Sequence, residues 1–142
     1  MYKRIVVTLD RSDLAEQALN HAVAIAEAFG ASIDLLMIVP VADRDAGHTV
    51  SVDWDAEIAE DEEYLAGVNS RVAEAGIEVH TELRRGKVAE EILHYADKSD
   101  ADLIVMSSHG RSGGGRWVYG STADRVLRYA PVPVLLIRAT EK

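Results

Sequence analysis

Glycine and hydroxyl side chains gather in one stretch of the chain whose composition suits phosphate binding. Residues 107–116 read Ser-Ser-His-Gly-Arg-Ser-Gly-Gly-Gly-Arg, and Gly120, Ser121 and Thr122 follow shortly afterwards. Glycine lets backbone N–H groups come close to an anion, and the first turn of a helix adds unpaired N–H groups and the positive end of a dipole. Because an apolar run precedes this loop and a helical pattern follows it, we predict that the segment binds a phosphate or a nucleotide.

The same residue types also permit plainer interpretations. A loop that only connects two elements would contain glycines too, Ser121 would serve as an ordinary N-cap, and Asp10 would serve as an acidic cap of the first helix. Helix capping and phosphate binding use the same N–H groups, so the sequence leaves both roles open.

Nothing in the pattern indicates a catalytic centre or a metal site. Residues 110–114 match Gly-x-Ser-x-Gly, but further glycines follow the serine and no histidine follows His109, so the nucleophile elbow of hydrolases is excluded. We interpret His109 as a loop residue that reaches phosphate or solvent. The five histidines show no metal-ligand spacing. We therefore expect no catalytic residues and no metal held by protein side chains alone.

Alternating strand and helix patterns must position the glycine-rich loop. Asp13 with Glu16 three residues later predicts a capping box at the first helix, and Gly30 predicts its end. The alternation predicts one doubly wound α/β domain over residues 1–142, with a parallel sheet whose ligand lies beyond the carboxyl ends of the strands. The expected strands are residues 4–9, 32–39, 77–83, 103–106 and 132–137, and the expected helices are residues 13–29, 53–76, 88–97 and 121–129.

Composition limits the location and the partners. The 142 residues carry 24 acidic and 15 basic side chains, a formal net charge of −9 that argues against a nucleic-acid partner. No apolar run approaches the roughly 20 residues of a membrane-spanning helix, and the chain has neither cysteine nor a secretory signal. We expect a cytoplasmic protein without a membrane partner.

Several motifs together resemble the ATP-binding branch of the universal stress protein family. Gly110 is followed by nine residues and then by Gly120 and Ser121, and the opening strand is followed by Asp10 as in that family. The closing helix from residue 120 and the strand that ends the chain are also similar. Two departures stand out, because Ser107 replaces the first motif glycine and Thr8 occupies a position where proline or another small residue is common. We expect the serine to weaken nucleotide binding without abolishing it.

The resemblance implies an adenine nucleotide alpha hydrolase-like, Rossmann-like sheet with strand order 3-2-1-4-5, and it implies a nucleotide site. Asp10 would lie near the ribose hydroxyls, the backbone of Ile38 would meet the adenine edge, and Ser121 with Thr122 would hold the end of the phosphate tail. The full set implied to border the nucleotide is Thr8, Leu9, Asp10, Ile38, Met106, Ser107, His109, Gly110, Arg111, Ser112, Gly113, Gly120, Ser121 and Thr122.

The expected function is that of an ATP-binding, nucleotide-responsive stress module, at most a slow ATPase. The sequence leaves open whether Mg²⁺ or Mn²⁺ accompanies the phosphates. The last strand is apolar at every position from residue 134 to 137, and an uncovered edge strand of that kind invites pairing. Together with the resemblance, this predicts a homodimer through residues 132–137. The alternatives are a non-nucleotide interaction protein of the same fold and a cyclic-AMP binder.

Overall fold

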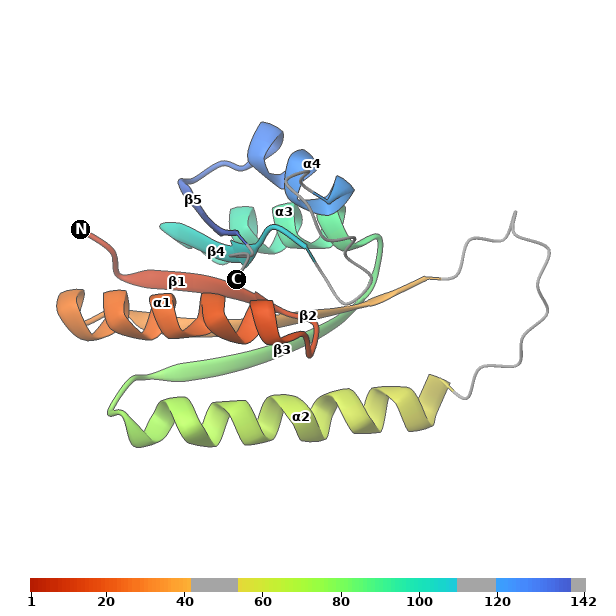
Figure 1. Ribbon diagram of the computed structural model, residues 1–142, viewed down its shortest axis with the longest axis horizontal. Helices are drawn as coiled ribbons and strands as arrows, with labels where there is room; N and C mark the ends of the chain where they lie inside the picture. Colours follow the sequence, from red (N-terminus) through yellow and green to blue (C-terminus); the bar gives the residue numbers. More distant parts are fainter. Residues whose placement is uncertain (42–53, 110–119, 139–142) are drawn as a thin grey trace.

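A five-stranded parallel sheet lies between two layers of helices in the computed structural model, which describes residues 1–41, 54–109 and 120–138 (Figure 1). The strand order β3-β2-β1-β4-β5 confirms the predicted doubly wound α/β fold. The strands are β1 (Arg4–Leu9), β2 (Ser32–Pro40), β3 (Val79–Gly86), β4 (Leu103–Ser107) and β5 (Val134–Ile137), and the helices are α1 (Asp13–Phe29), α2 (Trp54–Glu74), α3 (Val88–Lys98) and α4 (Ser121–Tyr129).

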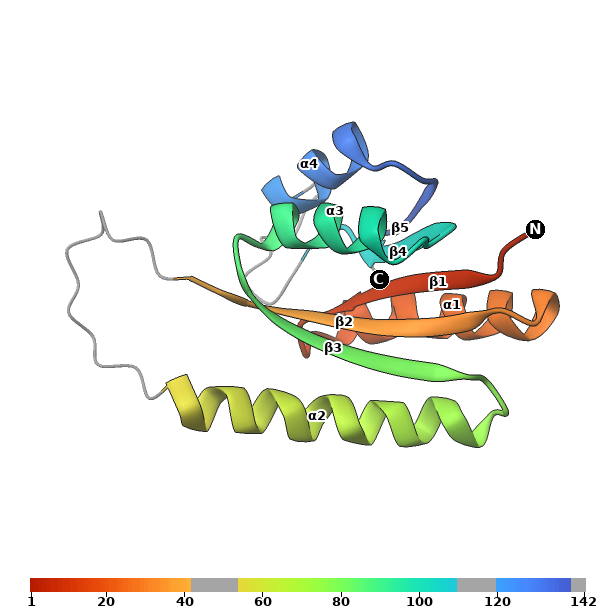
Figure 2. The same ribbon diagram turned by 180° about the vertical axis from the view of Figure 1, so that it is seen from behind.

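Side chains of successive strand residues point to opposite faces of the sheet, and this alternation divides the interior into two cores. Ile5 and Val7 of β1 pack in the core beneath α1 and α2, whereas Val6 packs in the core beneath α3 and α4. Figure 2 shows the second pair of helices on their own side of the sheet. Both faces are therefore covered, which explains why the central strands are apolar at nearly every position.

The cap of the first helix differs from the one expected. Helix α1 is capped by Ser12, whose Oγ accepts a hydrogen bond from the Ala15 N–H at 3.1 Å, so Asp13 is the first helical residue and not the cap. Glu16 does not complete a capping box, because its carboxylate binds side chains of α2 instead.

The bounds of both edge strands also differ from those expected. Strand β3 begins at Val79 and continues to Gly86, beyond the expected end at Leu83, because its charged residues 84–85 pair with β2 at an edge of the sheet. Strand β5 begins at Val134 and not at Val132, since Pro133 has no N–H to donate to the ladder.

The strand order brings two distant loops together. β1 pairs with β4 in parallel, with Val7 opposite Val105, so the segments that follow the two strands start side by side at the carboxyl edge of the sheet. The order reverses between these two strands, which is the position where sheets of this class bind ligands. Among the described residues, no helix has the length and apolar character needed to cross a membrane.

Candidate functional site

The ends of β1 and β4 form the centre of the candidate site. Leu9 and Met106 are buried, at 4% and 3% exposure, one in each of the two cores. Any contribution they make to a ligand must therefore come from their backbone. Thr8 is partly exposed and lies one residue before the end of β1.

Asp10 organises the turn between β1 and α1. Its Oδ1 accepts hydrogen bonds from the Ser12 N–H at 3.0 Å and from the Ser12 hydroxyl at 2.5 Å. The Ser12 oxygen in turn caps α1. Asp10 is thus not the helix cap itself, because it holds the serine that performs the capping.

Ser107, the residue in place of the first motif glycine, uses its side chain inside the protein. It is 8% exposed, and its hydroxyl donates to the carbonyl oxygen of His109 at 2.7 Å. The adjacent Ser108 N–H donates to the Ile137 carbonyl of β5 at 2.8 Å. The start of the loop is therefore fixed both by its own hydroxyl and by the edge strand.

The end of the loop returns to its beginning. The Gly120 N–H donates to the Ser108 carbonyl oxygen at 2.9 Å, which joins the two ends of the segment directly. A Cβ added at Gly120 would lie 3.3 Å from that same oxygen. A bulky substitution at Gly120 would therefore push the two ends apart. The intervening residues 110–119 lie outside the described residues, and with them Gly110, Arg111, Ser112 and Gly113.

Helix α4 begins in a form suited to an anion. Its N-cap is Gly120, with φ −64° and ψ 159°, so Ser121 is the first helical residue and the interpretation of Ser121 as the N-cap is wrong. Glycine has no side chain that could accept from the N–H groups of the first turn, and those groups have no partner within the helix. The hydroxyl-bearing residues Ser121 and Thr122 occupy this first turn, and the Ser121 side chain is exposed.

Ile38 lies beside the end of β1. The pairing of β1 with β2 finishes at Leu9 opposite Met37, so Ile38 is one residue beyond the last pair, while on its other side it pairs with Arg84 of β3. Its backbone is thus at the same edge of the sheet as Asp10.

Charged side-chain contacts that were not predicted from the sequence join α2 to this edge. Arg11 has a positive φ of 69°, and its Nε donates to Asp61 Oδ1 of α2 at 2.8 Å. This hydrogen bond raises the pKa of the guanidinium above its ordinary value. The turn contains no glycine, so the sequence carries no sign of the positive φ at Arg11.

A second contact between α1 and α2 lies close by. Tyr64 donates its hydroxyl to Glu16 Oε2 at 3.0 Å, and Arg71 donates to Glu16 Oε1 at 3.0 Å. Burial raises the pKa of Tyr64, and the carboxylates of Glu16 and Asp10 raise it further. The field of Asp10 therefore reaches the side chains of α2.

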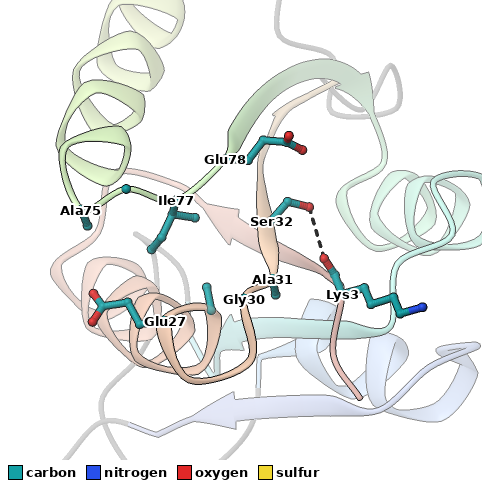
Figure 3. Close-up of a pocket in the computed structure, with 10 residues that line it drawn as sticks. Lys3, Glu27, Gly30, Ala31, Ser32, Ala75, Ile77 and Glu78 are labelled. Carbon is teal, nitrogen blue, oxygen red and sulfur yellow. Dashed lines mark hydrogen bonds between the residues drawn. The ribbon is translucent and has the colours of Figure 1, made fainter.

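A sizeable hollow lies elsewhere, at the amino edge of the sheet. It measures about 510 Å³ and is bordered by the carboxyl ends of α1 and α2, with Lys3, Ser32 and Glu78 among its lining residues (Figure 3). It contains none of the predicted site residues. Within the described ranges, the structure brings together no group of three side chains that could hold a metal ion.

Known proteins are similar to this chain over nearly its whole length. It is 36% identical to Universal stress protein MJ0531 of Methanocaldococcus jannaschii, with all of this chain and 85% of that protein covered. Among solved structures, UspA of Lactobacillus plantarum matches with a TM-score of 0.84 and 30% identity, covering 96% of this chain and 98% of that one. A universal stress protein of Archaeoglobus fulgidus, solved in complex with dAMP, matches with a TM-score of 0.72 and 29% identity over 96% of this chain and 98% of that one.

The model of the Universal stress protein family matches residues 1–138. This match includes the strand ends, the Asp10 turn and the glycine-capped helix described above. The chain belongs to the universal stress protein family.

Proposed function

We propose that this protein binds an adenine nucleotide at the carboxyl edge of the sheet, between the Asp10 turn and the first turn of α4. The observation that carries the proposal is the joined loop end at Gly120, which leaves the amides of a helix start without a side-chain cap. The dAMP complex of the Archaeoglobus fulgidus relative supports the choice of an adenine nucleotide.

ATP is the ligand we propose within this class. The first turn of α4 offers unpaired N–H groups and hydroxyls to a phosphate tail, and a loop containing several glycines leads into it. Asp10 is suited to the ribose hydroxyls and the Ile38 backbone to the adenine edge. The role that follows is a nucleotide-responsive stress module, at most a slow ATPase.

Ser121→Ala tests the phosphate part of the site. Since Gly120 and not Ser121 is the N-cap, loss of the hydroxyl should leave the free energy of unfolding nearly unchanged. We expect the affinity for ATP to fall by about 1–2 kcal/mol, because a hydrogen bond to a charged phosphate oxygen is lost. Adenosine should bind both variants equally, and calorimetric titration measures both ligands.

Ser70→Ala is the matched control, because Ser70 is an exposed serine of α2 whose hydroxyl bonds the Ala66 carbonyl oxygen. Equal ATP affinity of Ser121→Ala and wild type would contradict a phosphate contact there. Mass spectrometry of the ligand released by denaturing the purified protein separates the alternatives. A cyclic nucleotide would replace ATP in the proposal, and the absence of binding by any adenine compound in titrations would favour a non-nucleotide interaction protein.

We extend the proposal to a homodimer formed through β5. This strand is an edge of the sheet, and its four apolar residues are each only partly buried in the isolated chain. Pairing with a second copy would cover them. Sedimentation equilibrium should give twice the chain mass of 15.5 kDa, and a mass of one chain at micromolar concentration would contradict it. A cytoplasmic location follows from the proposed ligand, since ATP is a cytoplasmic metabolite, and cell fractionation tests it.

A further inference from the structure

Arg11 has a backbone conformation that is disfavoured for a residue with a Cβ atom. Its φ of 69° lies in the left-handed region, where a residue with a Cβ is disfavoured and glycine is not. Arg11 is also the middle residue of the turn in which Asp10 Oδ1 accepts from the Ser12 N–H. A disfavoured residue at the centre of a tight turn indicates that its side chain has a role, because glycine would fold there more easily.

The side chain of Arg11 is anchored on α2. Its Nε and Nη2 both donate to Asp61 Oδ1, and Nη1 lies 3.7 Å from Glu60 Oε2. The Asp61 side chain is only 7% exposed, whereas that of Arg11 is 27% exposed. A carboxylate this deeply buried requires a charged partner, so Arg11 and α2 depend on each other.

We propose that Arg11 is a positioning residue for the nucleotide, which fixes the Asp10 carboxylate by tying the turn between β1 and α1 to Asp61 of α2. The inference rests on the proposed nucleotide site. Arg11 itself faces Asp61 and is not assigned a contact with the ligand.

A comparison of two ligands distinguishes a positioning role of Arg11 from a direct contact of Arg11 with phosphate. Asp10 is suited to the ribose, which adenosine and ATP share, so loss of the anchor should weaken both ligands by the same factor. If the guanidinium instead contacted phosphate, ATP binding would weaken and adenosine binding would not. Calorimetric titration with adenosine and with ATP, at a temperature where every variant is fully folded, makes this comparison.

The variants are Arg11→Ala, Asp61→Asn and the double variant. We expect each single change to weaken both ligands about tenfold, which corresponds to roughly 1.4 kcal/mol. The double variant should be no weaker than either single one, because both changes remove the same ion pair. Arg11→Lys should recover part of the affinity, since the charge is kept while the two-nitrogen contact is lost.

Arg71→Ala is the matched control. Arg71 also joins α1 to α2, but it does so through Glu16, and its side chain is 59% exposed. Wild-type affinity is expected for this variant. Wild-type affinity of Arg11→Ala and Asp61→Asn would overturn the proposal, as would a loss confined to ATP.

A second measurement makes the result independent of ligand binding. Hydrogen exchange of the Ser12 and Ala15 amides reports on the turn, because these amides bond Asp10 Oδ1 and Ser12 Oγ. We expect at least fivefold faster exchange at both amides in Asp61→Asn, with the β4 amides unchanged. If the wild type binds no adenine compound, the proposed function fails while this exchange still decides whether Arg11 holds the turn. Unchanged exchange would overturn the inference even if nucleotide binding is established.

Discussion

The two edges of the same sheet differ in the polar groups that they contain: a buried carboxylate with side-chain partners lies towards the amino edge, and a helix start without a side-chain cap lies at the carboxyl edge. At the amino edge, side chains pair with one another. Asp34 is fully buried, and its Oδ2 accepts from Arg4 Nε at 2.9 Å, from Arg4 Nη2 at 2.8 Å and from the Tyr95 hydroxyl at 2.6 Å. At the carboxyl edge, a helix starts at Gly120 with no side chain to accept from its first amides.

The pKa of Tyr95 indicates that its hydroxyl serves an internal contact near the amino edge. Burial and the hydrogen bond to Asp34 raise the pKa of this phenol to about 12. The hydroxyl therefore remains a neutral donor to the carboxylate at physiological pH, and the pair has a structural role.

The hollow provides a second comparison of the two edges. The amino edge has the hollow of about 510 Å³, but its charged lining residues Lys3, Glu27 and Glu78 are of mixed sign. The candidate nucleotide site at the carboxyl edge is instead identified from backbone donors, strand ends and family membership. In this molecule, the position of a hollow and the position of the groups suited to phosphate do not coincide.

The largest effect that tests this comparison is expected for Asp34→Ala. The change removes the acceptor of Tyr95 and Arg4, and we expect the free energy of unfolding to fall by about 2–3 kcal/mol. The affinity for ATP at a temperature where the variant is folded should remain within about twofold of wild type. Urea denaturation and calorimetric titration measure the two quantities.

Asp97→Ala controls for the loss of a carboxylate, because Asp97 is an exposed residue of the same helix as Tyr95. Its stability should change by less than about 0.5 kcal/mol. A large loss of ATP affinity in Asp34→Ala would contradict this expectation, because it would show that the amino and carboxyl edges are coupled.

The smallest effect is expected for Glu78→Gln, which removes one negative charge from the lining of the hollow. Glu78 is exposed, and its Oε2 lies 3.2 Å from Nε2 of His80 on the surface. We expect changes below about 0.5 kcal/mol in both stability and ATP affinity. Calorimetric titration of this variant with ATP checks the expectation, and a tenfold weaker ATP affinity would place the nucleotide site at the amino edge.

Much of the fold followed from local patterns. The apolar runs of β1, β2 and β4 predicted their strands closely, since central parallel strands are apolar on both faces. The edge strand β3 was predicted less well, because residues 84–85 are charged and read as a loop. Charge is tolerated there only because the strand has one neighbour and a solvent-facing edge.

The candidate site was predictable as a pair of loops but not as a set of contacts. The strand order 3-2-1-4-5 implied by the resemblance places the first strand beside the fourth, and the pairing of β1 with β4 agrees with it. The roles of individual side chains were less predictable. For Ser107 only a weaker nucleotide binding was expected, and the hydrogen bond from its hydroxyl to the His109 carbonyl oxygen was not predicted.

The order and type of the elements and the family could be predicted from the sequence, because these depend on the periodicity of apolar residues and on short motifs. Only the tertiary structure decided that Arg11 pairs with Asp61 and that Asp34 pairs with Arg4 and Tyr95. These pairs join residues 30 to 61 positions apart. A charge in one sequence looks the same whether it faces water or a buried partner, and only the packing of one element against another fixes which of the two it meets.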